Sequence, residues 1–278
     1  NDMMMNFGAA GMAALAGPVL AWGGFFWVNM MALAVLLVMV TLALRALRLP
    51  PTVPPTDDDP LWTRIKVGAT TAWAVPGVRS AIVFISIVAL TASPFIALVP
   101  AMARVHFDGD AGLTARLVTA QGIGAVLGAL ALPVLAERFG RYRMLLAGLG
   151  ALAMLLVAYG LAPSPLVATI AIVGVGAAYM SVLSGIGTVV QLRAPTALRA
   201  RVLSFYFLAL GVVYPIGATL QGPVADRVGL GVVTASSGVV MVAALLVVRL
   251  VRPARFAALD DQPDQPDQPG SVSRPAAR

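Results

Sequence analysis

The sequence has no cysteine, a single histidine and few charged side chains: Asp, Glu, Lys and Arg make up 11% of its 278 residues. The lack of cysteine excludes disulfides and thiolate-bound metals. A soluble domain carries about 25% charged residues, so this chain could not cover a water-exposed surface. With 59% hydrophobic residues and a mean hydropathy of +0.90, it is predicted to be an integral membrane protein.

Long apolar runs divide the chain into eight predicted spans. A helix needs about 20 mostly apolar residues to cross a bilayer, and the runs lack the alternation typical of a membrane barrel. The fold class is therefore an all-α integral membrane bundle of about eight transmembrane helices. The spans are predicted at about 3–21, 24–46, 80–103, 113–136, 144–162, 165–190, 202–222 and 230–250.

The positive charges are distributed unevenly among the connections. Of the 19 Lys and Arg residues, sixteen lie in one set of connections or beyond the last span, and the other set holds only Arg104, Arg116 and Arg227. By the positive-inside rule, both termini are predicted to be cytoplasmic, in a multi-pass protein of the cell membrane. The net charge of +7 is then a topology signal, and no nucleic-acid partner is predicted.

Two polar segments lie outside the spans. In the cytoplasmic linker 47–79, a proline-rich stretch is followed by Asp59 and Pro60, which favour the start of an amphipathic helix on the inner membrane surface. A plain linker is the alternative. The segment 253–278, with its repeated Asp-Gln-Pro, is predicted to be a disordered cytoplasmic tail.

The span cores contain no Asp, Glu, Lys or His, so no catalytic residue, metal site or cofactor is predicted. His106 is expected to be a solvated residue of an outer loop. Polar side chains within spans could contact a solute or bridge two helices; they are Asn6, Asn29, Gln121, Tyr179, Ser181, Ser184, Gln191, Tyr206, Tyr214 and Gln221. The glycine runs 122–128 and 174–176 predict close helix packing rather than a nucleotide loop.

The stretch ERFGRYR, residues 137–143, places three arginines and a glutamate between two spans. One interpretation is a cytoplasmic loop that only fixes the topology. The stretch also resembles the charged loop signature of the major facilitator superfamily, G-x-x-x-D-R-x-G-R-[RK], with Pro133 and Glu137 in place of the first Gly and the Asp. In that family the signature follows the second helix and, in a weaker form, the eighth.

The first predicted span gives a second resemblance. Gly8, Gly17 and Pro18 are similar to the antiporter-like glycine-proline motif in the fifth helix of exporters of this superfamily. Both resemblances imply one register, in which residues 1–46 are the last two helices of the N-terminal half. Residues 47–79 then join the halves, and residues 80–252 form the C-terminal six-helix half.

Three further stretches, 94–104, 122–132 and 191–206, resemble the branch that contains enterobactin exporters and macrolide efflux proteins. A member of this superfamily has twelve helices, and this chain starts at Asn1 rather than at Met. We therefore expect a C-terminal fragment with helices five to twelve, whose partner is the missing N-terminal helices of the same protein.

The resemblance implies a secondary active transporter rather than an enzyme. It would be a proton-coupled antiporter that exports small amphipathic molecules, such as drugs, siderophores or metabolites, by alternating access. The implied gate is formed by Glu137, Arg138, Gly140, Arg141 and Arg143, and the implied substrate cavity is lined by Gln121, Tyr179, Ser184, Tyr206 and Tyr214. A transport-inactive scaffold or receptor-like fragment and a membrane-embedded enzyme are the alternatives.

Overall fold

The computed structural model describes residues 30–31, 33–43, 45 and 61–260. All regular elements within these residues are helical, which confirms the all-α fold class, and six of the helices are long and apolar enough to cross a membrane. The first predicted span lies outside the described residues, as do Gly8, Gly17 and Pro18. Of the second span, Leu33–Ala43 forms a shorter apolar helix.

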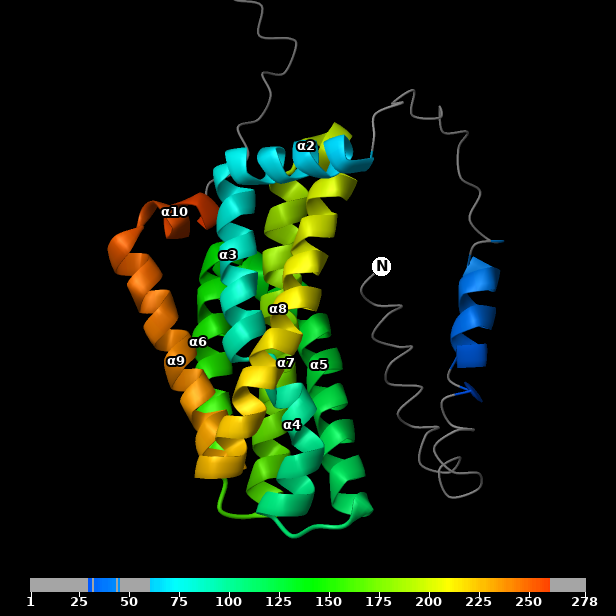
Figure 1. Ribbon diagram of the computed structural model, residues 1–278, viewed down its shortest axis with the longest axis vertical. Coiled ribbons are helices and arrows are strands. Elements are labelled where there is room, and N and C mark those ends of the chain that lie inside the picture. The colour runs from blue at the N-terminus through cyan, green and yellow to red at the C-terminus, as the bar shows by residue number, and fades with distance from the viewer. Residues whose placement is uncertain (1–29, 32, 44, 46–60, 261–278) are drawn as a thin grey trace, which may run out of the picture.

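The six spanning helices run alternately up and down through one bundle (Figure 1). The first is built from three consecutive pieces: α3 (Pro76–Thr91), α4 (Phe95–Ala101) and the short π-helix η1 (Met102–His106). The others confirm the remaining predicted spans; they are α5 (Ala111–Phe139), α6 (Arg141–Gly160), α7 (Pro165–Arg193), α8 (Arg199–Val228) and α9 (Leu230–Val251).

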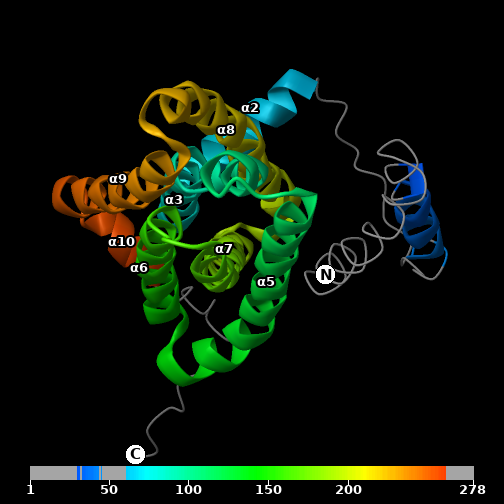
Figure 2. The same cartoon turned by 90° about the horizontal axis from the view of Figure 1, so that it is seen from below.

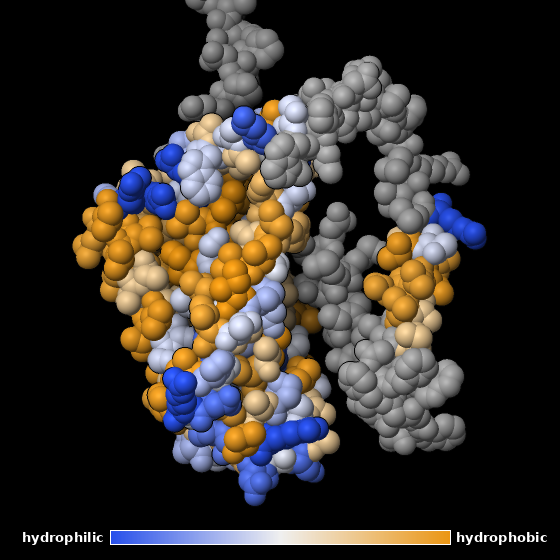
Figure 3. Space-filling view, viewed as in Figure 1, coloured by the Kyte–Doolittle hydropathy of each residue, from blue (hydrophilic) through white to orange (hydrophobic). Residues whose placement is uncertain are grey.

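The two ends of the bundle differ in charge. The connections at 107–110 and 161–164 lie at the lower end in Figure 1, so the turns at 140 and 194–198 lie at the upper end. The upper end, which we call the arginine-rich end, therefore carries the connections in which the sequence concentrates arginine. Figure 3 shows an apolar band between hydrophilic ends, as expected for a protein that crosses a bilayer.

Local signals explain where the helices begin and end. The side chain of Asp110 caps α5 by accepting a hydrogen bond from the backbone N–H of Leu113 at 2.8 Å. Ser164 caps α7 in the same way, with Pro165 at the first helical position. Gly140 and Gly229, with φ of 86° and 95°, separate α5 from α6 and α8 from α9. Only glycine adopts such angles without strain.

Helix α7 lies in the middle of the bundle, between α5 and α6 and against α3 (Figure 2). Glycines let α5 approach it closely: a Cβ atom on Gly124 or Gly128 would overlap the backbone of α7 at Val173 or Ala177. A Cβ atom on Gly176 of α7 would likewise overlap the backbone of α5. The predicted packing role of the glycine runs is thus confirmed at these positions. At Gly122, in contrast, such a Cβ would have no atom of the described residues within 4 Å.

Two short helices cross the arginine-rich end (Figure 1). Helix α2 (Leu61–Ala74) lies where the sequence predicts a helix in the linker: Ala72 is buried against the bundle, whereas Trp73 is 55% exposed. Its predicted place on the membrane surface stays a prediction. Helix α10 (Ala254–Asp260) corrects the expectation of disorder from residue 253 onward. Its apolar side buries Phe256, Ala258 and Leu259, which explains why this segment folds.

Candidate functional site

The first span is broken near its middle, between α3 and α4. Pro94 stands at this break, inside the third predicted span. Proline has no N–H, so it cannot donate to the carbonyl of Leu90, four residues earlier. The N–H of Phe95 donates to Ala92 instead of to Thr91. The carbonyls of Leu90 and Thr91 therefore lose their partners within the helix.

Gln221 of α8 supplies the missing partners. Its Nε2 donates to the carbonyl of Leu90 at 3.2 Å and to that of Thr91 at 2.9 Å. One turn before it, Gly217 lets α8 approach the break, because a Cβ atom there would overlap the Leu90 carbonyl and come within 3.0 Å of the Pro94 ring. Such external satisfaction is what allows broken helices in membranes. The Oε1 atom of Gln221 is buried and accepts no hydrogen bond from the described residues.

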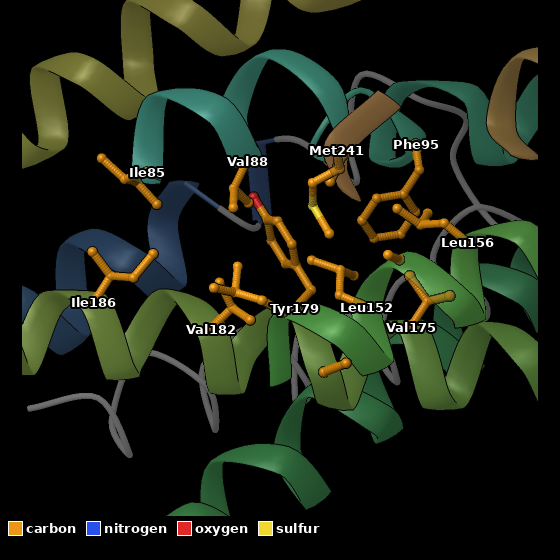
Figure 4. Close-up of a cluster of buried hydrophobic side chains, with 14 of the residues drawn as sticks. Ile85, Val88, Phe95, Leu152, Leu156, Val175, Tyr179, Val182, Ile186 and Met241 are labelled. Carbon is orange, nitrogen blue, oxygen red and sulfur yellow. The ribbon is translucent and has the colours of Figure 1, made fainter. Parts of the chain in front are cut away.

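Tyr179 of α7 approaches the same break from the other side. Its hydroxyl donates to Oγ of Ser93 at 3.0 Å, and Ser93 Oγ donates to the carbonyl of Val88 at 3.2 Å. Its ring packs edge-to-face on Phe95, with centroids 5.5 Å apart. Figure 4 shows Tyr179 reaching from α7 toward α3, with its oxygen beside Val88. Groups from three helices thus meet at the break, among aliphatic side chains.

The other predicted cavity residues lie at different distances from this break. Tyr214 is half-buried on α8 and close enough to Tyr179 for the two side chains to interact electrostatically. Gln121 is half-buried where α5 touches α7 at Gly176, about one turn from Tyr179. Both therefore belong to the region around the break.

Tyr206 and Ser184 lie toward the arginine-rich end. The hydroxyl of Tyr206 donates to the carbonyl of Leu183 at 2.9 Å, and its ring faces Gly187. Tyr206 therefore bridges α8 to α7. Ser184 is half-buried on α7, next to that contact. The structure thus divides the five predicted residues between the break and the α7–α8 bridge.

We expect Tyr206→Phe to lower the free energy of unfolding by about 1 kcal/mol, because it removes the hydroxyl that bridges two helices. Tyr159→Phe is the matched control. The hydroxyl of Tyr159 is buried on α6 and has no hydrogen-bond partner among the described residues, so its removal should leave the stability unchanged or raise it. Thermal unfolding of the purified chain in detergent measures both effects. Equal losses in the two variants would contradict the assigned bridge.

The charged turn at the arginine-rich end is well defined. The N–H of Gly140 donates to the carbonyl of Ala136 at 3.0 Å, and the N–H of Met144 donates to the carbonyl of Gly140 at 3.1 Å. The five residues of the predicted gate are exposed. Arg138 lies over the ring of Phe139 at 5.5 Å. Within the part of the chain that is described, Glu137 forms no ion pair with the arginines of this turn.

The same turn recurs at the opposite end of the bundle. Asp226, Arg227 and Val228 precede Gly229, as Glu137, Arg138 and Phe139 precede Gly140, and the glycines share nearly the same angles, with ψ of 147° and 141°. This repeat was not predicted, although the shared pattern Ala-acid-Arg-x-Gly indicates it. Ser93 was not predicted as a site residue either, although the run Thr-Ala-Ser-Pro marks its position.

The described residues contain no group of three His, Asp or Glu side chains that could hold a metal ion. His106 is exposed at the end of η1, as expected, with its ring 4.7 Å from that of Phe107. The arrangement offers hydrogen bonding within an apolar bundle and arginines at one end.

The model of a protein family described as transmembrane secretion effector matches residues 1–275, nearly the whole chain. No curated protein matches the chain.

Proposed function

Because the chain belongs to the transmembrane secretion effector family of the major facilitator superfamily, we propose that it works in proton-coupled export of small amphipathic molecules. Drugs, siderophores and lipophilic metabolites are the substrate classes. The protein is a membrane transporter, and we place it in the cell membrane with both termini in the cytoplasm. The uneven distribution of arginine between the two ends of the bundle supports this orientation.

The broken first span is the observation that carries the proposal. In secondary transporters, substrate sites lie near the bilayer midplane and are often built on discontinuous helices. Here the break at Ser93 lies near the middle of the span, and Tyr179 and Tyr214 lie near the middle of α7 and α8. We assign the substrate contacts to these tyrosines and to Gln121, since they offer hydrogen bonds beside an apolar surface.

The uncovered faces of α5 and α8 support a larger assembly. Only 22% and 17% of their apolar windows are buried within the described residues, against 33% to 56% for the other four spans. Helix α8 borders the break through Gln221, and α5 packs against α7 and α4. We propose that these faces meet the other half of a twelve-helix transporter, formed by preceding helices of the same protein, and that the two halves rock during transport.

The charged turn is proposed as the gate at the cytoplasmic end. Its arginines are exposed and not engaged by Glu137 within the described chain. They are therefore available to bind carboxylates or helix-end carbonyls of the other half. The planar guanidinium suits this role because it can donate two hydrogen bonds at once. Such contacts can form in one state of the transporter and break in the other.

The test is flux of a lipophilic cationic dye, driven by an imposed pH gradient, in vesicles that hold the protein at its native length. Arg138→Gln is expected to slow flux about tenfold or more, since charge-assisted hydrogen bonds are worth roughly 1.5 to 3 kcal/mol. Arg116→Gln, at the opposite end of the bundle, is the control and should leave flux close to wild type.

Orientation is measured in the same vesicles. The chain has no cysteine, so single cysteines at Ala111 and Thr196, which lie at opposite ends of the bundle, report the topology without background. We expect Arg138→Gln to leave their labelling by an impermeant reagent unchanged. Inverted labelling would mean that the turn serves topology alone. Dye binding without flux in the wild type would indicate a receptor-like protein instead.

A further inference from the structure

Four arginines lie close together near the start of α3 and the connection between α9 and α10. Arg79 lies in the first turn of α3, Arg249 in the last turn of α9, and Arg252 and Arg255 at the start of the segment that folds back as α10. Helix α10 packs against both α3 and α9, so the four cations share one small region. Figure 3 shows hydrophilic side chains at this edge of the apolar band.

Among the described residues, this cluster has no carboxylate counter-ion. The Nε atoms of Arg79 and Arg255 are both buried, and neither has a hydrogen-bond partner in the part of the chain that the structure describes. Within residues 61–260, none of the four arginines forms an ion pair with a carboxylate. Burial lowers the pKa of Arg255, and the neighbouring charges of Arg252 and Arg79 lower it further. Buried donors are nearly always paired in native proteins, so the region is suited to an acceptor from outside the described chain.

The packing around the cluster holds the arginines in place. Phe256 is buried and meets Phe84 of α3 edge-to-face, with ring centroids 4.8 Å apart. Arg249 lies over the Phe256 ring at 5.8 Å. The contact is close because Gly77 has no side chain: a Cβ atom there would lie 3.1 Å from the carbonyl of Ala258. The arginines are therefore positioned by α10 rather than free to separate.

The first turn of α3 adds to the attraction for an anion. Val75, at its N-cap, offers no side-chain hydrogen bond, and Pro76 occupies the first turn. An uncapped helix start carries a partial positive charge that favours anions. This end alone would not make a site, but here it stands beside arginines with unpaired donors.

We propose that Arg79, Arg252 and Arg255 bind the phosphate of an anionic phospholipid headgroup. Phosphate offers several oxygens to planar guanidinium donors. Headgroup phosphates lie at the edge of the hydrocarbon layer, where basic pockets between helices recognise anionic lipids. The cluster stands at that edge of the apolar band. Lipid bound here stabilises α10 against α3, and this role does not depend on which substrate is transported.

The test uses the full chain in a neutral detergent and follows its thermal unfolding with added phosphatidylglycerol or phosphatidylcholine. Phosphatidylglycerol is expected to raise the unfolding temperature of the wild type by several degrees, and phosphatidylcholine is not. Arg255→Gln and Arg79→Gln should each weaken the apparent affinity for phosphatidylglycerol about tenfold. Arg227→Gln, at the opposite end of the bundle, is the matched control and should respond like the wild type.

Arg255→Lys keeps the charge but loses the planar fork and Nε, and it serves if Arg255→Gln does not fold. We expect it also to weaken the response. An equal response of Arg79→Gln, Arg255→Lys and the wild type would overturn the proposal. So would a shift reproduced by inorganic phosphate alone, which would indicate a free anion. A response that emerges only after deletion of residues 261–278 would assign the site to the carboxylates of Asp261, Asp264 and Asp267.

Discussion

Gly124→Ala is expected to destabilise the protein by about 3 kcal/mol, enough to lower its unfolding temperature by about 5 °C or more. The added Cβ atom would overlap the backbone of Val173 in α7. Backbone atoms cannot relieve this overlap by a change of rotamer, as a side chain could. Helices α5 and α7 would have to separate along their seam. Because α7 stands in the centre of the bundle (Figure 2), the loss would spread to its other neighbours.

The control for this prediction lies two residues away in the same helix. At Gly122, no atom of the described part of the chain lies within 4 Å of the position that a Cβ would take. Alanine is a better helix former than glycine by roughly 1 kcal/mol, so Gly122→Ala should leave the stability unchanged or raise it. Thermal unfolding of both variants in one detergent decides the matter. Similar unfolding temperatures for the two variants would show that α5 and α7 are not in close backbone contact at Gly124.

The spans and their order could be predicted from the sequence because each depends on a local property, a run of apolar residues closed by charge, glycine or proline. The helix that begins after Pro60 was predictable for the same reason. The tail was misjudged because its repeated Asp-Gln-Pro dominated the composition. Helix α10 buries Phe256, Ala258 and Leu259 because it packs against α3. The local sequence alone does not indicate this tertiary contact.

The candidate site could be predicted only in part. Tyr179 was recognised as a polar residue inside a span, but its partner, Ser93, lies 86 positions away in the sequence. Gln221 was seen as one polar residue among several. Its importance depends on the proline of another helix, which is a pairing that only the folded chain provides. Pro94 is also ambiguous in sequence, since membrane helices tolerate proline when neighbours satisfy the freed carbonyls.

Gln221→Leu is the second variant with a large expected effect. It keeps the approximate size of the side chain but leaves the carbonyls of Leu90 and Thr91 without the donor that now serves them. We expect a loss of about 2 kcal/mol in unfolding free energy. Dye flux should fall as well, because the break would no longer be held beside α8. Gln121→Leu is the control for stability, since the side chain of Gln121 forms no hydrogen bond within the described residues.

A second substitution tests the cause of that loss. Pro94→Ala restores an N–H at the position from which a continuous helix would donate to the carbonyl of Leu90. In that background Gln221→Leu should cost less, with a coupling of about 1 kcal/mol in a double-mutant cycle. If the two effects simply add, Gln221 stabilises the bundle for a reason other than the carbonyls exposed by Pro94. If they couple, Pro94 causes the break in the first span, and the hydrogen bonds from Gln221 stabilise it.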